Sequence, residues 1–181
     1  MRALIGILVA IGLVVLVLVL IFSGGGGPTK KPLYLPDYAT STSFAQMSIR
    51  GPINAPQDHN DVRVTVSSSD SSLEIIKGYE DQTASTKTFD MTPAAYTQFL
   101  FALQRENFTK GNPDSSLKEN RGICPFGRLY TFVFNDGSNE RERYWTTSCG
   151  QGNFQGNGIA VRDLFQAQIP DYSTLTTDVN L

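Results

Sequence analysis

An uncharged apolar run at the start of the chain, Ala3–Phe22, constrains the fold more than any other feature. As a helix this run would be roughly 30 Å long, which is about the hydrocarbon thickness of a bilayer. All faces of that helix would be apolar, which does not suit a helix packed at the edge of a soluble core. The sequence therefore predicts a transmembrane anchor at residues 1–22, ahead of a domain that folds separately.

The same run could instead be a cleaved secretory signal, because the small residues Ser23–Gly25 follow it. It is longer than the usual apolar region of a signal and lacks a clear cleavage motif, which favours an uncleaved anchor. The basic residues Arg2, Lys30 and Lys31 flank both ends, so the positive-inside rule does not decide the orientation. Only a short segment precedes the run, and we expect a disulfide beyond it, so we expect a cytoplasmic N-terminus and an extracytoplasmic C-terminal domain.

The rest of the chain divides by composition. Residues 23–42 contain four consecutive glycines and several prolines, which predicts a flexible linker followed by an extended segment. Residues 43–172 carry the apolar patterns of one domain, and residues 173–181 form a threonine-rich tail that we expect to fray. The 15 Lys and Arg against 17 Asp and Glu leave no basic excess, so a nucleic-acid partner is not expected.

Short alternating segments dominate the first part of the domain and predict strands. Val62, Val64 and Val66 alternate with polar residues, as in a strand with one buried face. The expected β segments are Phe44–Arg50, Val62–Ser67, Leu73–Tyr79, Ser85–Phe89, Gly127–Phe134 and Asn139–Thr147. We expect them to form an antiparallel sheet of about five strands.

Two segments have helical periodicity. In Thr92–Glu106 a threonine and a proline mark a helix start, and an apolar stripe follows at positions 96, 99, 100 and 103. Ile159–Gln168 has a shorter stripe. Both helices have one apolar face, which predicts an α+β domain with two helices packed on the sheet.

The two cysteines of the chain flank a predicted hairpin. Asp136-Gly137 is a strong signal for a two-residue turn, and that turn pairs Tyr130 with Arg143 and places Cys124 opposite Cys149. We therefore predict a structural disulfide, which belongs in an oxidising compartment. The alternative is a pair of catalytic or metal-binding thiols, but two cysteines and one distant histidine do not make a zinc site.

The predicted register gathers aromatic and basic side chains on one face of the hairpin. This possible binding surface consists of Arg128, Tyr130, Arg141, Arg143 and Trp145. Arginine and aromatic rings can bind a ligand together through cation–π contacts. The alternative is that the rings belong to the core and the arginine stems lie over them.

Two further segments contain residue types that occur in phosphate, metal or catalytic sites. Gly150–Gly158 precedes a helix, but its spacing fits neither dinucleotide nor P-loop patterns, so special backbone angles explain its glycines better than a phosphate site. His59 and Asp61 could act as a base or bind a cation, although a lone histidine in a polar loop is usually solvated. No catalytic residue, metal or cofactor is therefore predicted.

Three stretches, Arg50–Ala55, Lys118–Arg128 and Trp145–Gly150, resemble those of a group of bacterial proteins. The group consists of uncharacterised, membrane-anchored extracytoplasmic proteins of small-genome candidate-phylum bacteria, of the Saccharibacteria kind. The likeness covers most of the domain, and its motifs are structural. It implies a bacterial cell-envelope setting and carries no activity.

These observations predict a non-catalytic binding or structural module of the cell envelope, held by a single membrane span. Its expected partner is an envelope protein, peptide or polymer. One alternative is a cell-envelope hydrolase that uses carboxylates. Another is a secreted inhibitor-like domain, which would require cleavage of the apolar run.

Overall fold

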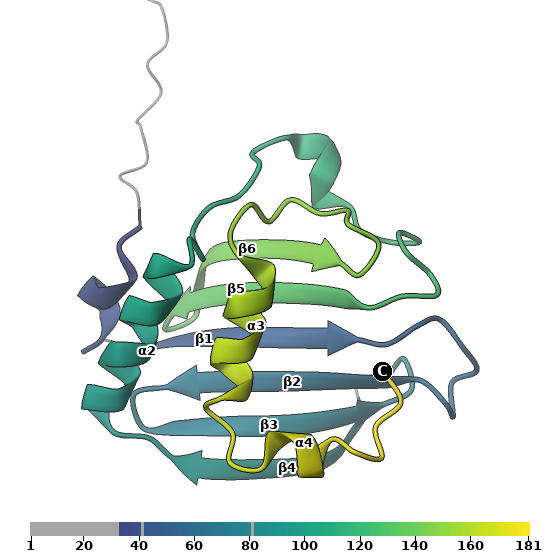
Figure 1. Ribbon diagram of the computed structural model, residues 1–181, viewed down its shortest axis with the longest axis horizontal. Coiled ribbons are helices and arrows are strands. Elements are labelled where there is room, and N and C mark those ends of the chain that lie inside the picture. The colour runs from purple at the N-terminus through teal and green to yellow at the C-terminus, as the bar shows by residue number, and fades with distance from the viewer. Residues whose placement is uncertain (1–32, 41, 81) are drawn as a thin grey trace, which may run out of the picture. The chain divides into compact units, whose positions relative to one another are not determined.

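A six-stranded antiparallel sheet carries helices on one face (Figure 1). The computed structural model describes residues 33–40, 42–80 and 82–181. The elements are η1 (Leu35–Tyr38), β1 (Ser43–Arg50), β2 (Asn60–Ser67), β3 (Asp70–Lys77), β4 (Gln82–Asp90), α2 (Pro93–Arg105), η2 (Ser115–Lys118), β5 (Leu129–Asp136), β6 (Asn139–Thr147), α3 (Gly158–Gln166) and α4 (Tyr172–Leu175). The strand order is β4-β3-β2-β1-β5-β6, so the predicted α+β class is confirmed with one strand more than expected.

The core lies between the sheet and the helices. On β1 and β2 every second side chain is buried, as the alternation of the valines predicts. The predicted stripe of α2, Tyr96, Phe99, Leu100 and Leu103, is buried in the same core. Each such side chain contributes about 1.5–3 kcal/mol by leaving water, so this interface stabilises the whole domain.

Both predicted helices are confirmed, with starts set by side-chain caps. The Thr92 hydroxyl accepts a hydrogen bond from Ala95 N at 3.2 Å, and the Asn157 side chain accepts one from Ala160 N at 3.2 Å. The chain also forms α4, a third, single-turn helix that the sequence did not predict. It begins at Tyr172, the last residue of the expected domain, and continues into the tail that we expected to fray.

Both ends of the described domain are more ordered than predicted. The segment expected to be extended forms η1, where Leu35 is fully buried and Leu35 N donates to Gln104 Oε1 at 3.0 Å. The compact unit therefore begins at Leu33 rather than at residue 43. In the expected tail, Leu175, Val179 and Leu181 pack against the core, because an apolar side chain every few residues lets the segment cover it.

The β5–β6 hairpin forms, but its predicted register is wrong. The turn consists of Gly137 and Ser138, one residue later than predicted, and only Gly137 has a positive φ, of 59°. A bulge beside Phe134 adds a further shift, so Tyr130 pairs with Thr146. The bulge makes the net displacement odd, so from Glu142 onward the β6 side chains lie on the face opposite to the predicted one.

The predicted disulfide between Cys124 and Cys149 is confirmed, with Cα atoms 5.9 Å apart. The register argument that suggested it does not hold, because both cysteines lie beyond the ends of the paired strands. Cys124 has a φ of 55°, and Gly127 N donates to its carbonyl at 3.0 Å. This turn, rather than strand pairing, brings the two sulfur atoms together.

The predicted anchor at residues 1–22, and the linker as far as residue 32, lie outside the described residues. Within the described ranges, no helix has both the length and the apolar character needed to cross a bilayer.

Candidate functional site: an arginine groove

The structure does not bring the five residues of the predicted binding surface together. Trp145 and Tyr130 project from opposite faces of the sheet, because of the register shift in the hairpin. Trp145 is 2% exposed, and its Nε1 donates to the Leu117 carbonyl at 2.7 Å. The loop containing η2 thus covers this ring and makes it part of the fold.

Two of the predicted arginines also have partners of their own. Arg143 lies on the same face as Trp145 and pairs with Glu140. Arg141 Nη2 donates to the Tyr38 hydroxyl at 3.2 Å, and its guanidinium lies 5.7 Å from the centre of that ring. Of the predicted surface, only Arg128 and Tyr130 share a site.

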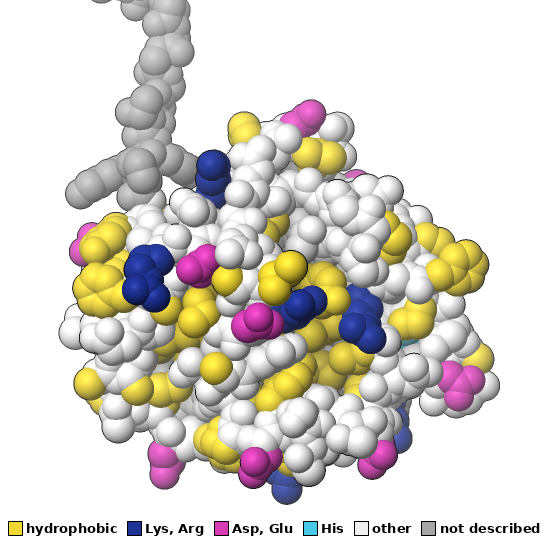
Figure 2. Space-filling model, viewed as in Figure 1, with side chains coloured by type: hydrophobic (Ala, Val, Ile, Leu, Met, Phe, Trp, Pro, Cys, Tyr) yellow, Lys and Arg dark blue, Asp and Glu magenta, His cyan; other side chains and the backbone are white. Residues whose placement is uncertain are grey.

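That site is a hollow of about 340 Å³ on the helix-covered face, which we call the arginine groove. It is lined by Ile49, Arg128, Tyr130, Arg162, Gln166, Tyr172, Thr176, Val179 and Leu181. In Figure 2, Lys or Arg side chains gather beside yellow hydrophobic surface in the middle of this face. The lining of the groove is mainly polar, with the apolar side chains of Ile49, Val179 and Leu181 beside its arginines and hydroxyl groups.

Regular elements hold its polar groups in place. Arg162 and Gln166 are four residues apart on α3, so they project on one side of that helix. Tyr172 and Thr176 have the same spacing at α4, and Thr176 Oγ1 donates to the Tyr172 carbonyl at 2.9 Å. Tyr130 lies on β5 and is 7% exposed, so its ring forms part of the wall.

The guanidinium groups of the groove have a hydroxyl and a main-chain oxygen as hydrogen-bond partners within it. Arg162 Nη1 donates to the Tyr130 hydroxyl at 3.3 Å, and its guanidinium lies 5.3 Å from the centre of that ring. Arg128 Nη2 donates to the main-chain oxygen of Leu181 at 2.9 Å. Arg162 Nε also lies 3.9 Å from Asp163 Oδ1, but the Asp163 side chain is 62% exposed and does not line the groove.

No acidic residue is among the described residues that line the groove. Burial raises the pKa of the Tyr172 hydroxyl, while Gln166 and the positive charges of Arg162 and Arg128 act in the opposite direction. Tyr172 is therefore neutral near neutral pH and adds no negative charge. Arg128 and Arg162 bring two positive charges to the groove, and no Asp or Glu side chain of its described lining offsets them, which favours an anionic ligand.

A second hollow of about 380 Å³ adjoins the groove, since Tyr130 and Arg162 line both. Thr146, Thr147 and Ser148 supply hydroxyl groups there, and the first turn of α3 supplies main-chain N–H groups. The positively charged surface thus continues from the groove to the start of α3.

The glycine-rich segment before α3 is explained by close packing. A Cβ atom added at Gly152 would lie 2.3 Å from the Trp145 carbonyl, and one at Gly156 would lie 2.4 Å from the Asn107 carbonyl. Gly152 also has a φ of 154°, which side chains rarely adopt. These contacts support the backbone interpretation of this segment over a phosphate-binding loop.

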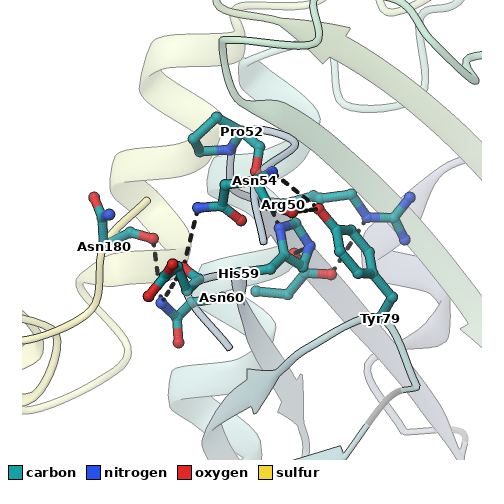
Figure 3. Close-up of polar contacts among 9 residues, drawn as sticks. Arg50, Pro52, Asn54, His59, Asn60, Tyr79 and Asn180 are labelled. Atoms are coloured by element: carbon teal, nitrogen blue, oxygen red, sulfur yellow. Dashed lines mark hydrogen bonds and ion pairs between the residues drawn. The ribbon is translucent and has the colours of Figure 1, made fainter. Parts of the chain in front are cut away.

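His59 is buried, which contradicts the expectation that it is solvated. The ring is 1% exposed and stacks on Tyr79, with 4.0 Å between the ring centres (Figure 3). Its Nδ1 donates to the Pro52 carbonyl at 3.0 Å, and its Nε2 lies 3.1 Å from Asp61 Oδ1. Loop residues 51–59 fold back over the end of the sheet, so a polar loop encloses the histidine.

The polar contacts around His59 continue through Asp61. Its Oδ2 accepts a hydrogen bond from Arg50 Nε at 3.3 Å. Both ring nitrogens of His59 thus contact protein atoms, and within the described ranges no group of three or more His, Cys, Asp or Glu side chains could hold a metal ion. We call Arg50, His59, Asp61 and Tyr79 the His59 cluster.

Sequence reasoning missed Arg162 and Tyr172 as partners of Arg128. Arg162 adjoins the apolar stripe of its helix, and Tyr172 follows a proline, so neither position has a local signal for binding. Their proximity to Arg128 depends on how α3 and α4 pack on the sheet. Only the tertiary structure gives this arrangement.

No family model matches the sequence, and comparison with curated proteins finds no match.

Proposed function

We propose that the chain is a membrane-anchored, extracytoplasmic binding module of the cell envelope, which acts by holding an anionic group of its ligand in the arginine groove. The observation that carries the proposal is the pair of guanidinium groups of Arg128 and Arg162, which share one hollow whose described lining includes no Asp or Glu side chain. A carboxylate or phosphate group of a ligand would supply the missing charge-assisted hydrogen bonds.

The proposed location rests on two features. The apolar run Ala3–Phe22 is long enough to span a bilayer, and the disulfide between Cys124 and Cys149 fits an oxidising compartment. The proposal places the domain outside because its disulfide fits that compartment. Treatment of intact cells with protease tests this placement, because an extracytoplasmic domain is removed and a cytoplasmic one is protected.

The hydrolase alternative depended on His59 and Asp61. Both ring nitrogens of His59 contact protein atoms, and the ring is 1% exposed, so this pair gives that alternative no support. The secreted inhibitor-like alternative depends on cleavage after the apolar run. Mass spectrometry of the native N-terminus distinguishes a secreted from an anchored protein.

Binding of the full-length chain to immobilised polymers tests the groove itself. The probes are polyphosphate, poly-L-glutamate and neutral dextran, so that phosphate and carboxylate ligands are distinguished. We expect binding to one or both anionic polymers, and a loss of at least tenfold in the double variant Arg128→Gln/Arg162→Gln. Two guanidinium contacts of about 1.5–3 kcal/mol each justify a loss of this size.

The matched control is Arg143→Gln, which removes the same charge on the opposite face of the sheet. It should bind like the wild type. Equal binding by the double variant and this control would show that the groove is not the anion site.

A further inference from the structure

Tyr79 presents a rigid, half-exposed ring beside another hollow, which is separate from the two described above. Its side chain is 48% exposed, whereas the His59 ring stacked against it is 1% exposed, with an angle of 15° between the planes. His59 covers one face of the tyrosine ring, so the exposed area lies on the other side and at the edge. Figure 3 shows the two rings lying against each other at the end of the sheet.

Several contacts fix the orientation of Tyr79. Its hydroxyl donates to the Asn54 carbonyl at 2.9 Å and accepts from Asn54 N at 3.0 Å. Underneath, the contacts of His59 with Pro52 and Asp61 prevent that ring from turning away. The tyrosine is therefore preorganised, and a ligand that stacks on it would lose little affinity to ordering of the protein.

The adjoining hollow has a volume of about 540 Å³, within the usual range of ligand sites of about 300–1,000 Å³. Its lining consists of Pro56, Gln57, Lys77, Gly78, Tyr79, Glu80 and Gln82. Among the described lining residues, Lys77 and Glu80 carry opposite charges, and the amides of Gln57 and Gln82 offer both donors and acceptors. This site shares no lining residue with the arginine groove.

We propose that the Tyr79 hollow binds a neutral glycan, with the apolar face of one sugar ring stacked on Tyr79. The C–H groups on such a face carry a small positive charge, which suits the negative face of an aromatic ring. The Gln57 and Gln82 amides can each donate to one sugar hydroxyl and accept from the next. The balanced charge of the lining favours a neutral sugar over an anionic one, in contrast to the arginine groove.

Saturation-transfer NMR with the full-length chain tests this site. The probes are two neutral trisaccharides, cellotriose and tri-N-acetylchitotriose. We expect saturable binding of at least one, with an affinity at least tenfold lower in Tyr79→Ala. Tyr79→Phe keeps the ring and should retain most of the affinity, although it removes the hydroxyl contacts with Asn54.

The matched control is Tyr34→Ala, which removes a tyrosine of similar exposure, 46%, away from this hollow. It should bind the trisaccharide like the wild type. If Tyr79→Ala does not fold, Gln57→Ala and Gln82→Ala serve in its place, since both residues are exposed, and each should weaken binding severalfold.

Absence of binding of both trisaccharides to the wild type would overturn the proposal. Equal affinity in the wild type and Tyr79→Ala, or equal loss in Tyr34→Ala, would do the same. None of these outcomes depends on the anion test, because Arg128 and Arg162 do not line the Tyr79 hollow.

Discussion

The arginine groove and the His59 cluster contain similar residue types, but their arginines contact different kinds of oxygen. In the His59 cluster, Arg50 Nε lies 3.3 Å from the Asp61 carboxylate, whose other oxygen faces His59. In the arginine groove, Arg162 donates to the neutral Tyr130 hydroxyl, Arg128 donates to the main-chain oxygen of Leu181, and the described lining includes no Asp or Glu side chain. A neutral oxygen compensates a guanidinium charge less than a carboxylate does, so an external anion gains more in the groove.

This difference explains why similar side chains have different expected roles. The carboxylate of Asp61 completes a set of contacts that fix a loop on the sheet. The guanidinium groups of the groove are held in place without an Asp or Glu side chain in the described lining. Variants can separate the two roles, because one set should change stability and the other should change binding.

The largest expected effect is on stability, and it comes from removing the disulfide at the edge of the groove. Cys124→Ser should lower the free energy of unfolding by about 3–4 kcal/mol, because the bridge no longer restricts the unfolded chain. Ser148 exchanges hydrogen bonds with Arg128 next to the bridge, so anion binding should weaken as well. Urea unfolding and polymer binding measure the two effects.

An unchanged urea midpoint for Cys124→Ser would contradict the stabilising role of the bridge. Alkylation of the wild-type protein without reductant provides the control. The wild type should not react, whereas the variant should react at Cys149.

The next effect is expected in the His59 cluster. Asp61→Asn keeps the size of the side chain but removes the charge that faces His59 and Arg50, and should cost about 2 kcal/mol of stability. Anion binding in the groove should not change, since Asp61 does not line it. Thermal unfolding and polymer binding of the same preparation measure both.

Glu140→Gln is the matched control for Asp61→Asn. It removes a carboxylate from an ion pair with Arg143 whose side chains are 43% and 56% exposed. Exposed pairs contribute about 0–1 kcal/mol, so its stability should be close to that of the wild type. Equal losses of stability in the two variants would mean that the Asp61 contact with buried His59 contributes no more than an exposed ion pair.

The smallest effect is expected from pH. Anion binding should stay constant between about pH 6 and 9, because arginine remains charged and burial raises the pKa of Tyr172. Above about pH 10 the Tyr172 hydroxyl begins to ionise, and its negative charge should then oppose the ligand. Affinity for the anionic polymer, measured across this pH range, checks the predicted direction. A gain in affinity above about pH 10 would contradict the prediction.

Local patterns predicted most of the fold. The alternation of Val62, Val64 and Val66 and the stripe of α2 each report a single buried face, which does not depend on distant contacts. The predicted register of the β5–β6 hairpin failed because the bulge beside Phe134 reverses the face on which the following β6 side chains lie. Such shifts depend on packing across the sheet, which a short sequence motif does not specify.

The candidate site was less accessible to sequence reasoning. Arg128 and Tyr130 were found because both lie at one hairpin, whereas Arg162 and Tyr172 come from later elements. His59 was expected in solvent because its neighbours in the sequence are polar. Its burial depends on stacking with Tyr79, which lies twenty residues later on the chain.

The most direct test of the account adds a carboxylate to the arginine groove without changing either arginine. Gln166 lines the groove one helical turn after Arg162, so Gln166→Glu places a negative charge beside the guanidinium groups. Ser85→Glu on β4 adds the same charge at an exposed position outside the groove and serves as the control. The account predicts that Gln166→Glu loses at least tenfold in affinity for the anionic polymer while its stability is unchanged or higher, and that Ser85→Glu binds like the wild type. Unchanged binding by Gln166→Glu would contradict the claim that uncompensated arginines form the site.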